Sequence, residues 1–145
     1  MSQILVALDF SDVSDRVVAE AGKLGKAFGD KLWLIHVAAP DPDFVGYEAG
    51  PQHVRDNRAH ELREEHRRLQ AWAEGLRAQG LEATALLVQG PTVSTLLETI
   101  KKHDIEYVVM GTHGHGKLYK LLMGNVSEGV IREAHVPVLL VPTQK

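Results

Sequence analysis

"QILVALDFSD", residues 3–12, places an apolar run of strand length (3–8) directly before an acidic turn. Four further short apolar runs follow along the chain, and most are rich in Val, Ile or Leu, residues typical of buried strands. They are KLWLIHV (31–37), LEATALLV (81–88), EYVVM (106–110) and VPVLLV (136–141). The first, second and fourth runs are almost continuously apolar, which is typical of strands buried on both faces of a parallel sheet.

The segments between these runs have the spacing of amphipathic helices. Helices are expected over 12–28, 55–79, 92–103 and 125–135, and Ser11 or Asp12 is expected to cap the first. The apolar residues near one face are Val13, Val17, Leu24 and Phe28 in the first helix, Leu62, Leu69, Trp72 and Leu76 in the second, and Val93, Leu96, Leu97 and Ile100 in the third. Strict alternation of strand and helix predicts a doubly wound α/β domain with right-handed crossovers.

The composition is that of an ordinary globular protein. The chain has 145 residues, 44% hydrophobic and 24% charged, which predicts one domain over 1–145. A net charge of -3 argues against a protein that coats nucleic acid or anionic lipid, and the lack of cysteine excludes disulfides and thiolate zinc sites. The first apolar run meets Asp9 at once, which argues against a signal peptide or membrane span and favours a cytoplasmic protein.

Two loops are candidates for a binding site. Ligands of open α/β sheets bind beyond the carboxyl ends of the strands, where the strand order reverses. If the first and fourth strands are neighbours, Asp9 and Gly111 open onto one crevice, where the Asp9 carboxylate can accept hydrogen bonds from ribose hydroxyls. Glycines at 111, 114 and 124 let backbone N–H groups approach phosphate oxygens, and the helix start at Asn125 attracts anions.

The same region nearly matches a phosphate loop, with Gly111 followed by Gly116 and Lys117. Leu118 occupies the position where that motif needs Ser or Thr, and the expected helix starts later, so the motif fails. His113 and His115 are too few for a closed zinc site without a further ligand, and no protein side chains are predicted to bind a metal. No Ser-His-Asp arrangement or pair of convergent carboxylates is recognisable, so no catalytic residue is predicted.

A longer pattern is more specific: Gly111, two residues, Gly114, nine residues, Gly124, then a small polar residue. With it, the chain resembles the universal stress protein family, and its nucleotide-binding branch most. The resemblance covers essentially the whole chain, including ILVALDFSDVS, LIHV, VQGP, and the ending MGTHGHG to LLMGNVSEGVIREAHVPVLLVP. It implies a Rossmann-like, open, parallel five-stranded sheet in the order 3-2-1-4-5, with helices on both faces, and ATP as ligand.

The resemblance also implies roles for individual residues. Asp9 meets the ribose, Ala7, Val37 and Met110 border the adenine with Gly90 close to it, and Leu8 belongs to the same set. The residues expected around the phosphates are Gly111, His113, Gly114, Gly124, Asn125, Val126 and Ser127. Asn125 departs from the family's Ser or Thr and lacks the hydroxyl that could lie beside a cation. Whether Mg²⁺ binds together with ATP therefore stays open.

The function implied by the resemblance is a stress-response module that binds ATP and acts as a nucleotide-responsive regulator. Two alternatives stay open: a slow ATPase or phosphotransferase in which Asp9 activates a water or hydroxyl, and a dimeric interaction protein without nucleotide. Residues 136–142 are expected to form an edge strand, and its antiparallel pairing with a second copy predicts a homodimer. The Pro- and Gly-containing segment 38–54 is either a connector or a lid over the site.

Overall fold

The computed structural model describes residues 2–38, 52–112 and 126–142, with the backbone alone for 52–55. Strands and helices alternate along these residues, as the sequence predicts. The strands are β1 (Gln3–Ala7), β2 (Lys31–Ala38), β3 (Glu82–Gln89), β4 (Tyr107–Gly111) and β5 (Val138–Val141). The helices are α1 (Ser14–Phe28), α2 (Gln52–Ala78), α3 (Thr92–Lys102) and α5 (Glu128–Glu133).

The five strands form one parallel sheet in the order β3-β2-β1-β4-β5, which confirms the predicted topology. β1 lies at the centre, and its last residue, Ala7, is in register with Ile35 of β2 and Met110 of β4. Along the chain, β2 and β3 are added on one side of β1, and β4 and β5 are then added on the other side. The strand order therefore reverses between β1 and β4, at the carboxyl ends of both strands.

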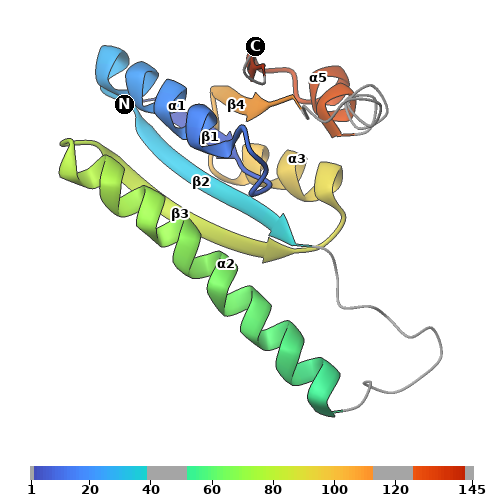
Figure 1. Ribbon diagram of the computed structural model, residues 1–145. Helices are drawn as coiled ribbons and strands as arrows, with labels where there is room; N and C mark the ends of the chain where they lie inside the picture. The colour runs from blue at the N-terminus through green and yellow to red at the C-terminus, as the bar shows by residue number, and fades with distance from the viewer. Residues whose placement is uncertain (1, 39–51, 113–125, 143–145) are drawn as a thin grey trace.

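Each face of the sheet is covered by its own helices, as in a doubly wound fold (Figure 1). One core cluster joins the sheet to α1 and α2, with Val17, Leu69 and Leu76 among its buried side chains. The other joins the opposite face to α3 and α5, with Leu96 and Val130 among them. α2 has 27 residues, about 40 Å of helix at 1.5 Å per residue. Its first turns extend beyond the ends of β2 and β3 (Figure 1).

Two details of α1 differ from the prediction. Phe28, expected on the apolar face, is 63% exposed and stacks on Tyr107, because it lies in the last turn, past the edge of the core. Ser11 and Asp12 do not cap the helix through their side chains; the N–H of Ser14 donates to the carbonyl oxygen of Ser11 instead. The hydroxyl of Ser14, the first residue of α1, donates to the Asp9 carboxylate.

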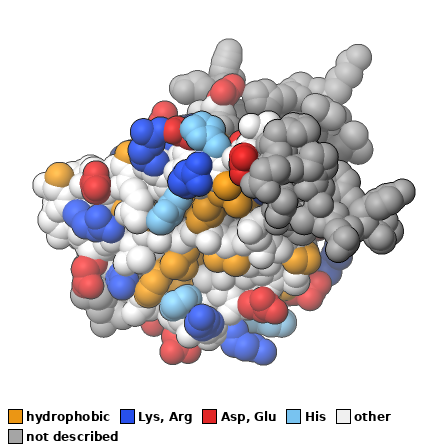
Figure 2. Space-filling view, turned by 90° about the horizontal axis from the view of Figure 1, so that it is seen from below, with side chains coloured by type: hydrophobic (Ala, Val, Ile, Leu, Met, Phe, Trp, Pro, Cys, Tyr) orange, Lys and Arg blue, Asp and Glu red, His pale blue; other side chains and the backbone are white. Residues whose placement is uncertain are grey.

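The surface carries many charges. In Figure 2, charged side chains and histidines surround hydrophobic side chains that remain partly exposed. His60 and His66 of α2 are exposed, as expected for surface residues on a charged helix. None of the helices in the described residues is long and apolar enough to cross a membrane.

Candidate functional site

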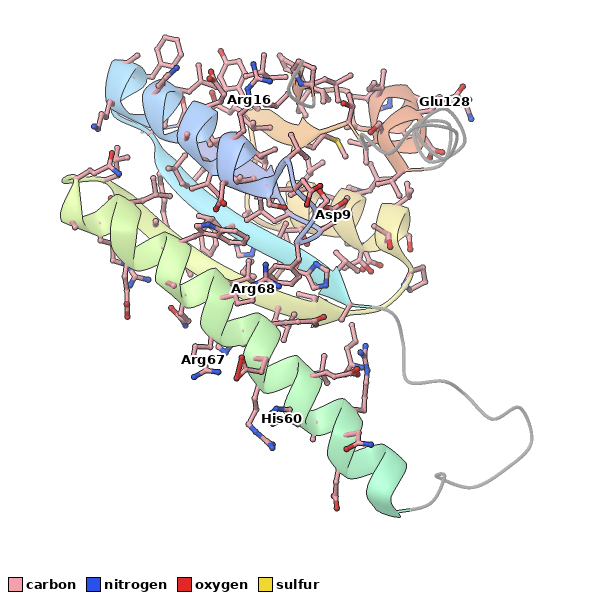
Figure 3. The ribbon with its side chains drawn as sticks, in the orientation of Figure 1. Asp9, Arg16, His60, Arg67, Arg68 and Glu128 are labelled. Atoms are coloured by element: carbon pink, nitrogen blue, oxygen red, sulfur yellow. The ribbon has the colours of Figure 1, made fainter. Side chains whose placement is uncertain are left out.

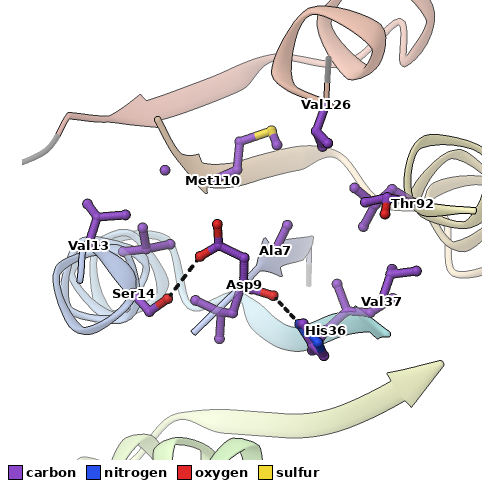
Figure 4. Close-up of a pocket in the computed structure, with 14 residues that line it drawn as sticks. Ala7, Asp9, Val13, Ser14, His36, Val37, Thr92, Met110 and Val126 are labelled. Atoms are coloured by element: carbon purple, nitrogen blue, oxygen red, sulfur yellow. Dashed lines mark hydrogen bonds between the residues drawn. The ribbon is translucent and has the colours of Figure 1, made fainter. Parts of the chain in front are cut away.

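A cavity of about 280 Å³ opens at the carboxyl ends of β1 and β4, where the strand order reverses (Figure 4). Its volume is close to the lower end of the range for small-molecule sites, roughly 300–1,000 Å³. The walls come from the ends of β1, β2 and β4, the first turns of α1 and α3, and the residue after the undescribed segment 113–125. The lining residues are Ala7, Leu8, Asp9, Val13, Ser14, Val17, Ile35, His36, Val37, Thr92, Leu96, Met110, Gly111 and Val126.

Most of these walls are apolar, and a few side chains supply polar groups. Met110, Val37 and Ala7 lie around the centre of the cavity, while the hydroxyls of Ser14 and Thr92 lie on opposite sides of it (Figure 4). An apolar enclosure with a small number of placed polar groups is the usual design of a site for a planar, partly apolar ligand. The cavity suits such a ligand better than a small ion.

Asp9 supplies a carboxylate to the cavity from the turn after β1. Its Oδ1 accepts a hydrogen bond from the N–H of Ser11 at 3.0 Å and another from the hydroxyl of Ser14 at 3.4 Å. The first of these bonds closes an Asx turn, in which a side chain bonds the backbone two residues further on. Phe10, in the middle of this turn, has a φ of 62°. A residue other than glycine pays about 1–2 kcal/mol for that left-handed conformation.

His36 lies at the cavity wall, and both of its ring nitrogens face groups of other elements. Its Nδ1 lies 2.8 Å from the carbonyl oxygen of Leu8, and its Nε2 lies 3.7 Å from Oε1 of Glu65 on α2. The ring therefore links the end of β1 to α2. Within the described residues, no group of three or more His, Cys, Asp or Glu side chains is placed to hold a metal ion.

The structure brings most of the sequence-predicted site residues to one place. The residues of that set that line the cavity are Ala7, Leu8, Asp9, Val37, Met110, Gly111 and Val126. Ser127 follows Val126 and is 1% exposed. His113, Gly114, Gly124 and Asn125 lie outside the described residues, as does most of the segment 38–54. Gly90 is absent from the lining and lies just before α3, with a φ of 155°.

Two of the predicted glycines have a packing reason to be glycine. A Cβ on Gly111 would lie 2.6 Å from Cγ1 of Val13, so the close contact of β4 with α1 excludes a side chain there. A Cβ on Gly90 would lie 2.7 Å from Oγ1 of Thr95 on α3. Both distances are shorter than a real Cβ contact. Close helix packing therefore explains these glycines without any ligand.

Some lining residues are missing from the sequence prediction: Val13, Ser14, Val17, Ile35, His36, Thr92 and Leu96. Val13, Val17 and Leu96 do appear in the sequence analysis, but as core residues of their helices. The sequence signal that could identify such residues is their position in the first turn of a helix that follows a strand, because that turn lies at the carboxyl edge of the sheet. Applied to the helices after β1 and β3, that rule selects Ser14 and Thr92.

Comparison with known proteins supports one family. Residues 1–142 match the model of the Universal stress protein family. The universal stress protein in the QAH/OAS sulfhydrylase 3' region of Thermus aquaticus is 33% identical over 144 residues, covering 95% of this chain and 96% of that protein.

Solved structures of the family share the fold. The structure of protein MJ0577 of Methanocaldococcus jannaschii superposes with a TM-score of 0.82 at 20% identity, covering 99% of this chain and 97% of that one. A family protein of Arabidopsis thaliana with AMP bound has a TM-score of 0.64 at 18% identity, covering 99% and 93%. The same fold carries cAMP in another universal stress protein and dAMP in one from Archaeoglobus fulgidus, at TM-scores of 0.67 and 0.65. At identities below 25% these likenesses show a shared fold.

Proposed function

The chain belongs to the universal stress protein family, and from this premise we propose that it binds an adenine nucleotide, ATP first among them, between β1 and β4. The observation that carries the proposal is the cavity itself. It lies at the switch point of the sheet, has apolar walls and holds a carboxylate at its mouth. Structural relatives of the same fold bind cAMP, dAMP and AMP, which supports an adenine nucleotide as the ligand class.

Each part of the nucleotide has a counterpart in the cavity. The adenine fits between Ala7, Val37 and Met110, since an aromatic base gains by replacing water against apolar walls. The ribose hydroxyls donate to the carboxylate of Asp9, and a hydrogen bond to a charged acceptor is among the stronger ones. In this arrangement the phosphates run from the end of β4 toward the start of α5.

Two buried hydroxyls support that path for the phosphates. Thr112 and Ser127 are 6% and 1% exposed, and their side-chain oxygens have no hydrogen-bond partner among the described residues. They lie on either side of 113–125, which contains Gly114, Gly124 and Asn125. Buried polar atoms normally have partners, so two such hydroxyls beside a glycine-rich segment fit a site built for phosphate oxygens. When bound, the nucleotide would supply those acceptors.

The proposed role is that of a nucleotide-responsive regulatory module in the stress response. Hydrogen bonds from Ser11 and Ser14 fix the direction of the Asp9 carboxylate, which suits holding a ribose. Under this proposal nucleotide binding changes the order of the segments around the cavity, and thereby the affinity for a partner. Hydrolysis is not required for such a role.

The direct test is to identify what the purified protein carries and binds. We expect protein denatured after purification to release an adenine nucleotide on chromatography, and the emptied protein to bind ATP in calorimetry more tightly than GTP. Phosphate release with Mg²⁺ present measures whether turnover accompanies binding. A protein that neither releases nor binds ATP, AMP or cAMP contradicts the proposal.

We also propose that the protein is a homodimer paired through β5. Within the described residues β5 pairs with β4 alone, so it forms an edge of the sheet, and Leu139 on it is 44% exposed. The stretch 136–142 carries no charged residue that would discourage pairing with another strand. Antiparallel pairing with a second copy would cover this edge and give a two-fold interface.

The dimer is tested with Leu139→Lys. The native protein should sediment as a dimer at micromolar concentration, and Leu139→Lys should sediment as a monomer, because the new charge lies on the exposed face of the pairing strand. Val138 and Leu140 are less suitable, since both pack against the core on the α3 side. Ala71→Lys on the exposed side of α2 is the control and should remain dimeric. A native protein that sediments as a monomer, or a dimeric Leu139→Lys variant, counts against β5 as the interface.

A further inference from the structure

We propose that Phe10 is a positioning residue of the nucleotide site: held in a left-handed conformation by side chains of α2, it fixes the turn that orients the Asp9 carboxylate. The inference rests on the proposed function, because it assumes that Asp9 meets the ribose. It assigns a task to a residue that does not line the cavity and that the glycine pattern of the family does not include.

The turn gives the first reason. In this turn the N–H of Ser11 donates to Oδ1 of Asp9, and Phe10, between the two, reverses the chain direction with a φ of 62°. Bulky residues rarely adopt this conformation, and in functional sites it persists when the surroundings enforce it. The direction of the Asp9 side chain therefore depends on the conformation of Phe10.

The surroundings of the Phe10 ring supply the enforcement. The ring stacks on Trp72 with centroids 5.8 Å apart and planes 14° from parallel, and it lies 4.4 Å from the ring of His36. The guanidinium of Arg68 lies 4.5 Å from the Phe10 centroid, within the range of a cation–π contact. In Figure 3, Arg68 lies on the side of α2 that faces the sheet, whereas Arg67 and His60 point away from it.

Further contacts anchor this cluster, which we call the Phe10 clamp (Phe10, His36, Arg68 and Trp72). The indole N–H of Trp72 donates to Oδ1 of Asp15 on α1 at 2.9 Å. His36 contacts the carbonyl oxygen of Leu8, the residue just before Asp9. The clamp thus joins α1, α2 and β2 around the turn. A displacement of α2 would reach the Asp9 carboxylate through Phe10, although none of the α2 side chains that the structure describes lines the cavity.

Alanine and glycine at position 10 separate conformation from packing. Both remove the ring, but glycine adopts a positive φ without cost whereas alanine does not. If residue 10 acts through the turn, Phe10→Ala should weaken AMP binding about tenfold, as expected for loss of one hydrogen bond to a carboxylate. Phe10→Gly should then bind AMP more tightly than Phe10→Ala, although it fills less space. A purely structural role predicts the opposite order.

The ligand provides the second comparison. An AMP analogue that lacks the ribose 2'- and 3'-hydroxyls cannot use the Asp9 carboxylate, so its affinity should be nearly the same in the native protein and in Phe10→Ala. Trp72→Ala, which removes the stacking partner on α2, should reproduce the selective loss for AMP. Equal losses for AMP and the analogue, or glycine binding no better than alanine, would overturn the inference.

A measurement without nucleotide keeps this test apart from the proposed function. Hydrogen exchange of the Ser11 amide reports directly on its bond to Asp9. In the native protein this amide should exchange slowly, in Phe10→Ala fast, and in Phe10→Gly at an intermediate rate. If native protein binds no nucleotide, the proposed function fails, and the Ser11 exchange rates still decide whether Phe10 fixes the turn. Equal exchange in all three proteins refutes the role of Phe10 whatever the protein binds.

Discussion

Gly111→Ala is expected to lower the free energy of unfolding by about 2 kcal/mol, the usual cost of adding atoms to a packed interior. The new Cβ would lie 2.6 Å from Cγ1 of Val13 and 3.1 Å from Cγ2 of Val17, and both valines are buried. At 2.6 Å either the Val13 side chain or α1 must shift, and a β-branched side chain has few alternative rotamers to shift into. Chemical denaturation should show a lower midpoint with an unchanged slope.

Two variants control for this prediction. Gly75 is exposed in α2, and a Cβ there would meet no atom within 4 Å. Gly75→Ala should therefore raise stability by about 1 kcal/mol through helix propensity alone. The second control is the double variant Gly111→Ala with Val13→Ala, in which the atoms that clash with the new Cβ are absent. Its loss of unfolding free energy should be smaller than the sum of the losses in the two single variants. Additive costs would show that the contact with Val13 is not what requires glycine at 111.

The fold is predictable from the sequence because its signals are local and repeated. Strand-length apolar runs alternate with amphipathic segments, and this alternation alone selects a parallel sheet covered on both faces. The ends of the helices are less predictable, since they depend on tertiary contacts. α5 spans Glu128–Glu133 rather than 125–135, and α2 begins at Gln52 rather than 55. Phe28 has helical spacing to Val17 and Leu24, but in the last turn of α1 its ring stacks on the exposed Tyr107 and stays 63% exposed.

The candidate site is predictable in outline and less so in detail. Asp9 follows β1, and Met110 and Gly111 end β4, so the meeting of these strands at the switch point brings the three residues together. The left-handed conformation of Phe10 is not visible in the sequence, because phenylalanine is an unfavourable residue for it. In our proposal the Phe10 clamp stabilises that conformation, and its Trp72 is 62 positions away along the chain. Such long-range compensation has no local sequence signal.

The roles of Gly111 show how one residue can satisfy two requirements. At the end of β4 it lines the cavity, where its backbone would approach the proposed phosphates, and its contact with Val13 independently excludes a side chain. The measurements separate the two requirements, because the packing role appears in the stability of ligand-free protein. A role in binding would appear in nucleotide affinity at temperatures where Gly111→Ala is still folded.

Ala7→Leu is expected to weaken adenine nucleotide binding at least about a hundredfold, or 2.7 kcal/mol, while leaving the protein folded. Ala7 is the last residue of β1 and lies at the centre of the cavity wall (Figure 4), so three added carbon atoms would occupy the space proposed for the base. The cavity has room for them, and the apolar neighbours Val37 and Met110 would pack against the new side chain. Stability should therefore stay level or rise, in contrast to Gly111→Ala.

This opposition between affinity and stability makes the Ala7→Leu experiment decisive for the location of the site. Calorimetry with ATP and AMP measures the affinity, and thermal unfolding without ligand measures the stability. Ala71→Leu, which adds the same atoms on the exposed side of α2, should change neither quantity appreciably. Loss of binding together with loss of stability would indicate a disturbed sheet rather than a filled cavity. Native affinity in a folded Ala7→Leu protein would place the nucleotide elsewhere, because a base and a leucine side chain cannot share the wall between Val37 and Met110.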